Sequence, residues 1–127
     1  MEVLKERVGQ RRAMFDWYME TFEATPGLAF QQEPEGYFSN RWLTALLLHK
    51  QETGYDRETL RLKLGEDNIE SRPLWKPMHL QPVFEGTPFY GDGTSEQLFQ
   101  NGLCLPSGSN LSSEDLHRIQ AAWPYGK

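Results

Sequence analysis

The sequence is poor in the residues and patterns that mark several classes of protein. It contains a single cysteine, Cys104, so no disulfide can form within the chain. The three histidines, His49, His79 and His117, are far apart, and Cys104 has no second cysteine at CxxC spacing. Metal sites in proteins draw on characteristically spaced histidine and cysteine ligands. We therefore expect neither a disulfide-stabilised fold nor a bound metal ion.

Long apolar runs and clustered positive charge are also missing. No apolar stretch approaches the roughly 20 residues that a membrane-spanning helix needs. The formal net charge is -5, and Arg11–Arg12 is the only adjacent basic pair, whereas a nucleic-acid groove needs a basic face. Residues 1–5 lack the charged-then-apolar pattern of a signal peptide. With the lone cysteine, these features favour a cytoplasmic protein, with neither a membrane nor a nucleic acid as partner.

The composition is that of a folded domain. The chain has 127 residues, of which 38% are hydrophobic and 24% are charged. A chain of this length can bury roughly two thirds of its unfolded surface, so we predict a single domain over residues 1–127. Aromatic residues reach 13%, which predicts either an aromatic-rich core or rings exposed at an interface or ligand surface.

The first half of the chain predicts a long helix followed by two strands. Apolar residues recur at helical spacing over residues 2–23, and residues 25–27 form a strong helix stop. Residues 28–31 are expected to form a short strand. Residues 42–48 are apolar on both faces, which suits a strand covered on both sides by helices or by another domain. A small isolated domain seldom covers both faces, so this run suggests that part of the protein lies outside the chain.

The second half predicts helices that alternate with short strands. Asp56 is the expected N-cap of a helix that Gly65 ends, and Ser112 with Asp115 is the expected cap of the last helix, which Pro124 ends. The other expected elements are a strand over 69–73, an irregular stretch over 74–93, a helix over 94–100 with a capping box from Thr94 to Gln97, and a strand over 103–106. This order favours an α+β fold, in which helices pack on a small, mostly antiparallel sheet.

Three short motifs could carry chemistry, but each has a simpler structural interpretation. Cys104 lies between two leucines in an expected strand, which is more typical of a buried small hydrophobe than of a nucleophile. Residues 91–94 are glycine-rich and precede a helix, yet they match no nucleotide-binding fingerprint and read as a turn with a cap. Residues 107–109 carry two hydroxyls without a nucleophile motif, and they lead into the last helix.

The most informative stretch is residues 72–84. Its three prolines make it stiff and extended, and it places arginine, lysine and histidine beside aromatic rings. Stiff loops that present polar groups next to rings are good ligand surfaces. The alternative is a packed crossover loop in which Trp75 and Phe84 fill the core.

The stretch from residue 69 to 84, IESRPLWKPMHLQPVF, resembles the C-terminal domain of DegT-type sugar-nucleotide aminotransferases. More narrowly, it looks like the enzymes that aminate C4 of a UDP-linked 2-acetamido-4-keto-6-deoxy sugar, as in bacillosamine-type pathways. The blocks at 39–44 and 98–109 agree with the family in order and spacing, and the opening at 1–12 resembles the helix that follows its coenzyme-phosphate motif. The resemblance covers nearly the whole chain.

This resemblance implies a two-domain parent of which the chain is the smaller part. Such enzymes transfer an amino group from glutamate to a keto nucleotide sugar and use pyridoxal phosphate. Their Schiff-base lysine, the aspartate opposite the pyridine nitrogen and most phosphate contacts lie in a large domain that this chain does not contain, so Lys50, Lys63 and Lys76 are not assigned that role. The expected partners are the large domain and a second subunit, and the chain alone is expected to bind no cofactor and to be inactive.

The resemblance also places the loop at 75–79 at the mouth of the substrate site. Lys76 is the expected partner of the substrate diphosphate, as a point charge. His79 is expected to hydrogen-bond near the sugar or the coenzyme, and Trp75 to pack against the ligand. Arg72 is a further candidate, although an arginine before a proline at a strand end could simply pair with an acidic neighbour. No catalytic residue is expected within the chain.

Two functions from other classes stay open at this point. The chain could be a free-standing module whose aromatic residues, Trp75 and Tyr90 among them, form a carbohydrate platform. It could also be an adaptor that docks a protein partner through the helix at 2–23. The strand at 42–48 argues against a free module, because such a module should have one polar strand face. The residues Asn40 and Arg41, in the second family-like block, are expected to be structural.

Overall fold

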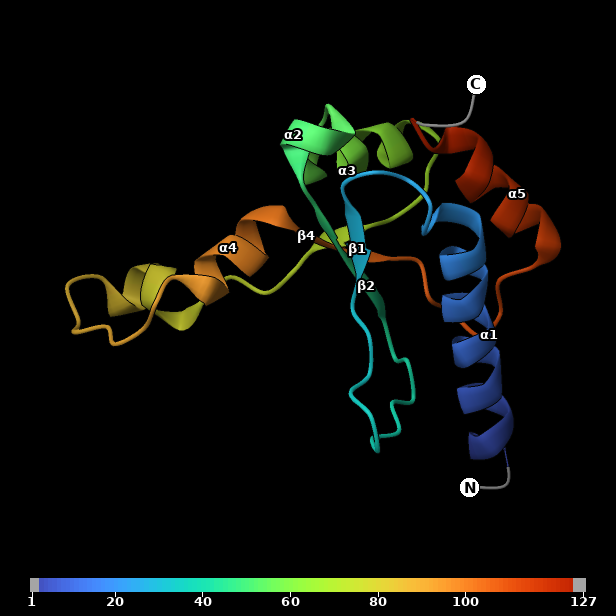
Figure 1. The fold of residues 1–127 in the computed structure, drawn as a ribbon, viewed down its shortest axis with the longest axis horizontal. Coiled ribbons are helices and arrows are strands. Elements are labelled where there is room, and N and C mark those ends of the chain that lie inside the picture. The colour runs from blue at the N-terminus through green and yellow to red at the C-terminus, as the bar shows by residue number, and fades with distance from the viewer. Residues whose placement is uncertain (1–2, 125–127) are drawn as a thin grey trace.

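The computed structural model describes residues 3–124. Its helices, strands and 3₁₀ turns follow one another as α1 (Leu4–Phe22), β1 (Leu28–Phe30), β2 (Thr44–Leu48), α2 (Lys50–Thr53), α3 (Arg57–Glu66), β3 (Arg72–Pro73), η1 (Met78–Leu80), η2 (Pro82–Phe84), α4 (Thr94–Asn101), β4 (Gly102–Leu105) and α5 (Ser113–Ala122) (Figure 1). The start of the predicted first helix, at Glu2, lies outside the described residues.

The four strands form one sheet in the order β1-β2-β4-β3, and every neighbouring pair is antiparallel. The register pairs Cys104 with Ala45 on one side and with Arg72 on the other. Paired residues share a face, so these three lie on one face, which we call the outer face. Leu46 and Leu103, also paired, lie on the opposite inner face and are fully buried. The predicted α+β fold with an antiparallel sheet is confirmed.

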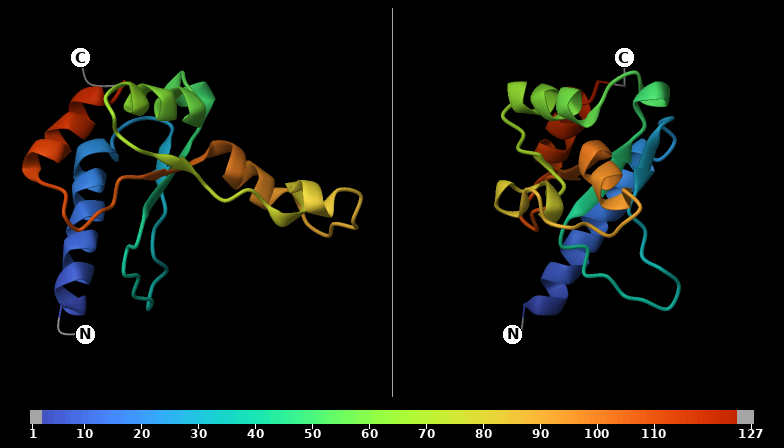
Figure 2. Two further views of the ribbon diagram at one scale, coloured as in Figure 1. Left: turned by 180° about the vertical axis from the view of Figure 1, so that it is seen from behind. Right: turned by 90° about the vertical axis from the view of Figure 1, so that its left-hand side faces the viewer.

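The inner face is covered by helices that supply an aromatic core. Helices α1 and α5 lie on one side of the sheet and α4 lies on the other (Figures 1 and 2). From α1, Phe22 stacks on Trp123 with ring centroids 4.1 Å apart. The Tyr18 side chain is fully buried, and its hydroxyl donates to the Pro106 carbonyl at 2.9 Å. The aromatic residues are thus divided between the core and the surface.

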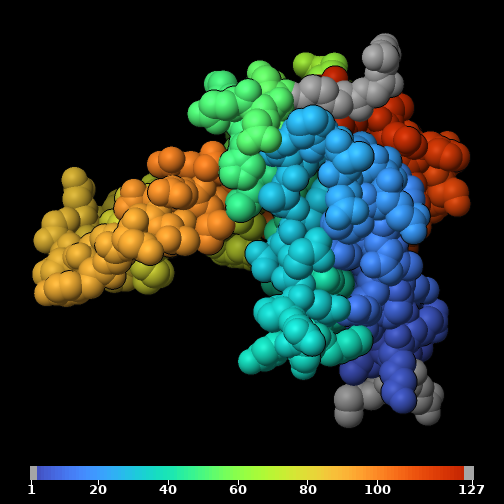
Figure 3. Space-filling model, viewed as in Figure 1, coloured from blue at the N-terminus to red at the C-terminus, as the bar shows by residue number. Residues whose placement is uncertain are grey.

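Residues 74–101 form an arm that projects from the outer-face side of the molecule, and we call the other described residues the body. The arm comprises η1, η2, the loop that follows them and α4; α4 adjoins the body, and the far end of the arm stands clear of it in the space-filling view (Figures 1 and 3). None of its residues is buried. The predicted irregular stretch at 74–93 therefore corresponds to two 3₁₀ turns and a loop, carried on α4.

Several predicted boundaries differ from those in the structure. The strand predicted at 42–48 begins only at Thr44, because the chain turns beforehand at Arg41, whose φ is 49°. The strand predicted at 69–73 is reduced to its last two residues. The strand predicted at 103–106 covers 102–105. The short helix α2 was not predicted at all, since four residues are too few to show a periodic pattern.

Helix caps were predicted with mixed success. The Asp56 carboxylate accepts from the Thr59 backbone as predicted, and the capping box of Ser112 with Asp115 is present. The box from Thr94 to Gln97 is wrong: Gly93 is the N-cap, and the amide of Thr94 donates to Asp92. Helix α3 also passes through Gly65 to Glu66, and the left-handed turn falls at Asn68, which tolerates a φ of 57°.

Candidate functional site

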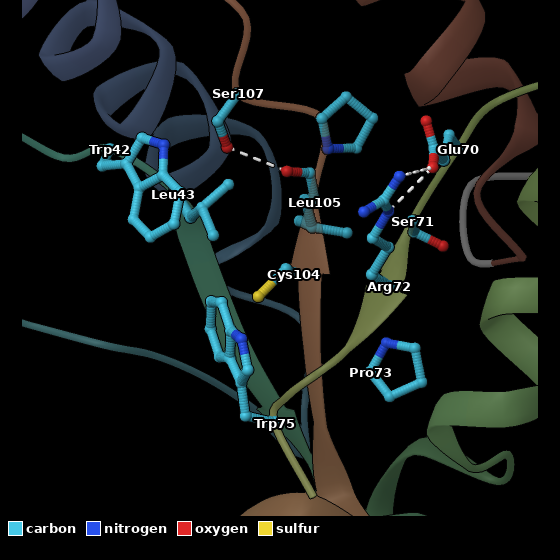
Figure 4. A pocket seen from close by; sticks show the side chains of 11 residues that line it. Trp42, Leu43, Glu70, Ser71, Arg72, Pro73, Trp75, Cys104, Leu105 and Ser107 are labelled. Atoms are coloured by element: carbon cyan, nitrogen blue, oxygen red, sulfur yellow. Dashed lines mark hydrogen bonds and ion pairs between the residues drawn. The ribbon is translucent and has the colours of Figure 1, made fainter.

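A pocket of about 380 Å³ opens where β2, β3 and β4 meet the start of the arm (Figure 4). The two indole rings lie to one side, Arg72 and Pro73 lie to the other, and Cys104 lies between them. The lining residues are Trp42, Leu43, Glu70, Ser71, Arg72, Pro73, Trp75, Cys104, Leu105, Pro106 and Ser107. Most of these side chains are apolar, so the pocket suits a ligand with an apolar face.

Two exposed tryptophans, Trp42 and Trp75, line one side of the pocket. The Trp42 side chain is 59% exposed and that of Trp75 is 67% exposed. Their ring centroids are 6.1 Å apart and the rings are tilted by 36°. Tryptophan is highly buried on average, so two neighbouring exposed indoles are an unusual feature of this surface.

The position of Trp42 is fixed from α1. The guanidinium of Arg11 donates to the Trp42 carbonyl and, at 3.0 Å, to the Ser107 carbonyl, so one side chain ties together two segments of the pocket wall. The Asn40 side chain accepts from the Trp42 amide at 3.0 Å. These contacts explain why a charged residue interrupts the apolar face of α1, and they give Asn40 the structural role predicted for it.

The neighbouring arginine, Arg12, anchors the loop before β2. It pairs with Glu33 through two hydrogen bonds of 2.7 and 3.1 Å and donates to the Ser39 carbonyl at 2.6 Å. The hydrogen bonds from Arg12, together with one from the Ser39 amide, lower the pKa of Glu33 to about 2. Arg41 is buried over the Phe15 ring, 3.6 Å from its centroid, as a structural residue. The loop that leads to Trp42 is therefore held in place by contacts of both Arg12 and Arg41.

The polar groups around the pocket are mostly occupied. Arg72 donates to Glu70 at 2.6 and 2.8 Å, which is the acidic neighbour that the sequence suggested as an alternative. The Ser107 hydroxyl donates to a backbone carbonyl and accepts from the Thr44 amide. The Ser71 hydroxyl is buried and has no hydrogen-bond partner among residues 3–124. Because its oxygen is enclosed within the protein, this hydroxyl is not exposed to the pocket.

Cys104 lies at the floor of the pocket. Its side chain is buried, and burial raises the pKa of the thiol. A nucleophilic cysteine needs a lowered pKa, which comes from a nearby positive group or a helix N-terminus. Cys104 is therefore a small apolar surface, as the sequence predicted.

The structure divides the predicted site residues into two groups. Arg72 and Trp75 line the pocket, whereas Lys76 and His79 do not. The Lys76 side chain is exposed and has no ion-pair partner among the described residues. His79 is half-buried within the arm: its Nε2 lies 2.9 Å from Glu96, and its ring stacks on Phe89 with centroids 3.6 Å apart. His79 therefore helps to hold the arm together.

Sequence reasoning did not single out Trp42 or Arg11 for this site. Trp42 stands in one of the family-like blocks, but nothing in the sequence shows that it meets Trp75, which is 33 positions away. The signal that could have found Arg11 is its place in an otherwise apolar helix face, where a charged side chain requires partners.

Residues 3–124 contain neither a cluster of metal ligands nor a membrane-spanning helix. No three histidine, cysteine, aspartate or glutamate side chains within this range are placed to hold a metal ion. No helix within it is both long enough and apolar enough to cross a bilayer.

Comparisons with known proteins agree with this architecture. EpsN of Bacillus subtilis (strain 168), which carries the name of a pyridoxal phosphate-dependent aminotransferase, is 42% identical over 123 residues, covering 94% of this chain and 31% of EpsN. GDP-perosamine synthase of Escherichia coli O157:H7 is 26% identical over 116 residues, covering 91% of this chain and 30% of that protein. The chain thus spans about a third of the length of the curated relatives it matches.

The fold recurs in solved structures. The structure of DesI, determined in the presence of its TDP-sugar product, superposes with a TM-score of 0.84 at 20% identity, covering 95% of this chain and 31% of DesI. The sequence profile of the DegT/DnrJ/EryC1/StrS aminotransferase family matches residues 1–123. Since this match covers almost the entire sequence, the chain belongs to the DegT/DnrJ/EryC1/StrS aminotransferase family.

Proposed function

We propose that this chain is the small domain of a pyridoxal phosphate-dependent enzyme that transfers an amino group from glutamate to a keto sugar linked to a nucleotide. The observation that carries the proposal is the 42% identity to EpsN over 123 residues, which make up only 31% of that relative. Two further matches support a nucleotide-linked sugar: one relative is named GDP-perosamine synthase, and the structure of DesI was determined in the presence of its TDP-sugar product. The preferred substrate is a UDP-linked 2-acetamido-4-keto-6-deoxy sugar, because of the block at 69–84.

In our proposal, Lys50, Lys63 and Lys76 do not hold the coenzyme. A Schiff-base lysine has to be enclosed beside its cofactor, whereas Lys50 and Lys63 are exposed on the surface and paired with Asp56 and Glu66. Lys76 is exposed as well, and none of the three lines the tryptophan pocket. In our proposal, the coenzyme, which supplies the electron sink when bound, is held by a larger domain and a second subunit.

The chain would contribute one wall of the substrate site. Trp75 offers an apolar face, and the exposed ammonium of Lys76 suits a diphosphate because it has no competing acidic partner among the described residues. Arg72 offers a second cation. We propose that His79 acts mainly by positioning, since a contact to the sugar or the coenzyme would require it to leave Glu96.

A chimera tests this function. Residues 1–123 replace the matching segment of EpsN, and wild-type EpsN is the control, assayed first with a panel of keto nucleotide sugars to fix the substrate. We expect the chimera to bind pyridoxal phosphate and to transfer amino groups from glutamate, whereas the 127-residue chain alone does neither. A stoichiometric coenzyme adduct on one lysine of the chain alone, with turnover, contradicts the proposal. So does a folded, coenzyme-loaded chimera that transfers nothing to a substrate that EpsN uses.

The alternative of a free-standing carbohydrate module gains little from the structure. Trp75 lines the pocket with Trp42, but Tyr90, which is 92% exposed, does not line it. The two aromatics proposed for a sugar platform therefore do not share one surface hollow. Binding of free sugars to the chain, measured by calorimetry, distinguishes the two functions.

A further inference from the structure

We propose that the Trp42–Trp75 pocket is the seat of a nucleobase, so that this chain holds the base of the nucleotide sugar. The proposal rests on the function proposed above and names the part of the substrate that this pocket takes. What carries it is the convergence of two exposed indoles from different segments over an apolar floor, with a cation at the opposite wall.

The shape and lining of the pocket suit a flat ring. Its volume of about 380 Å³ exceeds what a single base requires, and its floor is formed by Cys104, Leu105 and Pro106. Bases have apolar π faces that stack on aromatic side chains regardless of base identity. The exposed faces of Trp42 and Trp75 would lose water when such a ring covers them, which is favourable.

The polar lining argues against a sugar ring in the same place. A sugar presents several hydroxyls that each require a partner when they are buried. Here the Ser107 hydroxyl both donates and accepts within the protein. The Ser71 hydroxyl has no partner among the described residues, but its oxygen is enclosed and does not face the pocket. A mostly apolar lining with few available hydrogen-bonding groups suits the face of a base better than the many hydroxyls of a sugar.

The charge at the wall opposite the tryptophans completes the arrangement. Arg72 and Glu70 are 77% and 73% exposed, so their ion pair is weak and the guanidinium can exchange its partner. Phosphate oxygens accept bidentate hydrogen bonds from arginine. Arg72 is therefore placed to meet the phosphates attached to a base that stacks on Trp75.

The pocket is also assembled before any ligand arrives. The Arg11 side chain joins the carbonyl of Trp42 to that of Ser107, and these residues form adjoining parts of the wall. A wall that is already ordered reduces the entropy cost of binding. Arg11 is thus a positioning residue for Trp42, without being within the pocket lining.

The test is a titration of the 127-residue chain with UMP, TMP and GMP, with ribose 5-phosphate and N-acetylglucosamine as ligands that lack a base. Proton–nitrogen NMR spectra follow the indole N–H signals of the four tryptophans, which are assigned by single substitution. We expect every nucleotide to shift the Trp42 and Trp75 signals saturably, while the signals of Trp17 and Trp123 stay in place. We expect ribose 5-phosphate and the free sugar to leave all four unchanged.

Substitutions define the contribution of each ring. Trp75→Leu and Trp42→Leu are expected to weaken nucleotide binding about five- to a hundredfold, and Trp42→Phe to retain part of the affinity. Tyr90→Leu, which removes an exposed aromatic outside the pocket, is the matched control and should bind as the wild type does. Arg11→Met is expected to weaken binding while the spectrum keeps its dispersion.

Four outcomes would each contradict the proposal that this pocket binds a nucleobase. In the titrations, these are the absence of a saturable shift with any nucleotide, equal shifts with ribose 5-phosphate, and preferential binding of the free sugar. The fourth is an unchanged nucleotide affinity in both tryptophan-to-leucine variants. The same variants in the EpsN chimera separate this proposal from the function. If amino transfer persists with an unchanged KM for the nucleotide sugar, the pocket assignment is wrong and the function stands. If the chain binds nucleotides through both tryptophans but the chimera transfers nothing, the function is wrong and the pocket stands.

Discussion

The body and the arm of this chain are ordered by different means. In the body, a single cluster of buried side chains joins α1, α3 and α5 to the sheet. In the arm, no residue is buried, and large apolar side chains such as Val83 and Tyr90 are 78% and 92% exposed. Burial is the main source of folding free energy. The body therefore buries enough apolar surface to stabilise its own fold. The conformation of the arm depends instead on local contacts and on the surfaces that the arm contacts.

The local contacts of the arm are short in range. Two 3₁₀ turns follow one another at η1 and η2, and Pro77 and Pro82 fix φ at their starts. The Thr87 hydroxyl closes the next turn on the Phe84 carbonyl at 2.7 Å. Segments with few buried contacts open at a lower free energy than the core does. Such a segment suits a role at a binding surface, where its order is completed by a partner.

The sharpest test of the contrast is a pair of apolar truncations. Leu60→Ala, in the buried core of the body, is expected to cost about 2–5 kcal/mol in the free energy of unfolding. Val83→Ala, in the arm, is expected to change it by less than about 0.5 kcal/mol. Urea denaturation followed by circular dichroism measures both. Equal losses in the two variants would show that the arm belongs to the same cooperative unit as the body.

The opposite pattern is expected for substrate binding. In the EpsN chimera, Lys76→Ala should weaken nucleotide-sugar binding about ten- to a hundredfold, which corresponds to the roughly 1.5–3 kcal/mol of a hydrogen bond to a charged group. The loss should appear mainly in KM, because the diphosphate is bound in both the ground state and the transition state. Thermal melts should be unchanged. Lys50→Ala, an exposed lysine of the body, is the control, and an identical loss there would remove Lys76 from the site.

A substitution at the junction of the body and the arm should change both the stability of the protein and the position of the arm. At Gly102, where α4 passes directly into β4, an added Cβ would overlap the Leu74 side chain and lie 2.5 Å from the Leu98 carbonyl oxygen. Gly102→Ala is therefore expected to cost about 1–3 kcal/mol as overpacking and to displace the arm. Denaturation and amide chemical shifts of the arm measure these two effects. A fully stable variant whose arm signals are unmoved would show that the junction relaxes without strain.

A smaller and local effect is expected from the histidine of the arm. His79→Ala removes the contact to Glu96 and the stacking on Phe89. Amide hydrogen exchange in residues 78–96 should accelerate about fivefold, as for the loss of roughly 1 kcal/mol of local stability, while exchange in the body stays the same. His117→Ala serves as the control. Acceleration in both regions would show that His79 supports the body as well.

The smallest effect is a pH dependence confined to the body. Glu33 has a pKa lowered to about 2 by Arg12 and the Ser39 amide, against an ordinary value of 4.5. A lowered folded-state pKa gives stability that is present above pH 4.5 and is lost as the pH falls toward 2. We expect Tm to fall across this window, and to fall less steeply in Glu33→Gln. The same slope in both proteins would assign the acid sensitivity to other carboxylates.

Sequence reasoning succeeded where the determinants were local. The caps at Asp56 and Ser112 depend on side chains that reach backbone amides three residues away, so they could be read directly. The end of α3 was misplaced because Asn68, rather than Gly65, adopts the left-handed turn. The projection of the arm was not predictable, since it depends on how α4 leaves the sheet and not on any periodic pattern.

The candidate site was predictable only in part for the same reason. Arg72 and Trp75 both lie within residues 72–84, the stretch that the sequence predicted to be a ligand surface. Trp42 joins them only because the sheet register places β2 and β3 on either side of β4. Register follows from the packing of the entire inner face, and no single segment encodes it.

The order of the strands also has a consequence for variation among proteins with this fold. Since β3 and β4 are antiparallel neighbours, residues 74–101 are topologically one long hairpin loop, and Pro73 remains paired with Leu103 whatever lies between them. The entropy of closing a loop rises only slowly with its length, by about 0.6 kcal/mol for each doubling. Insertions, deletions or exchange of the arm should therefore leave the body able to fold. The same body can therefore carry arms of different length and sequence.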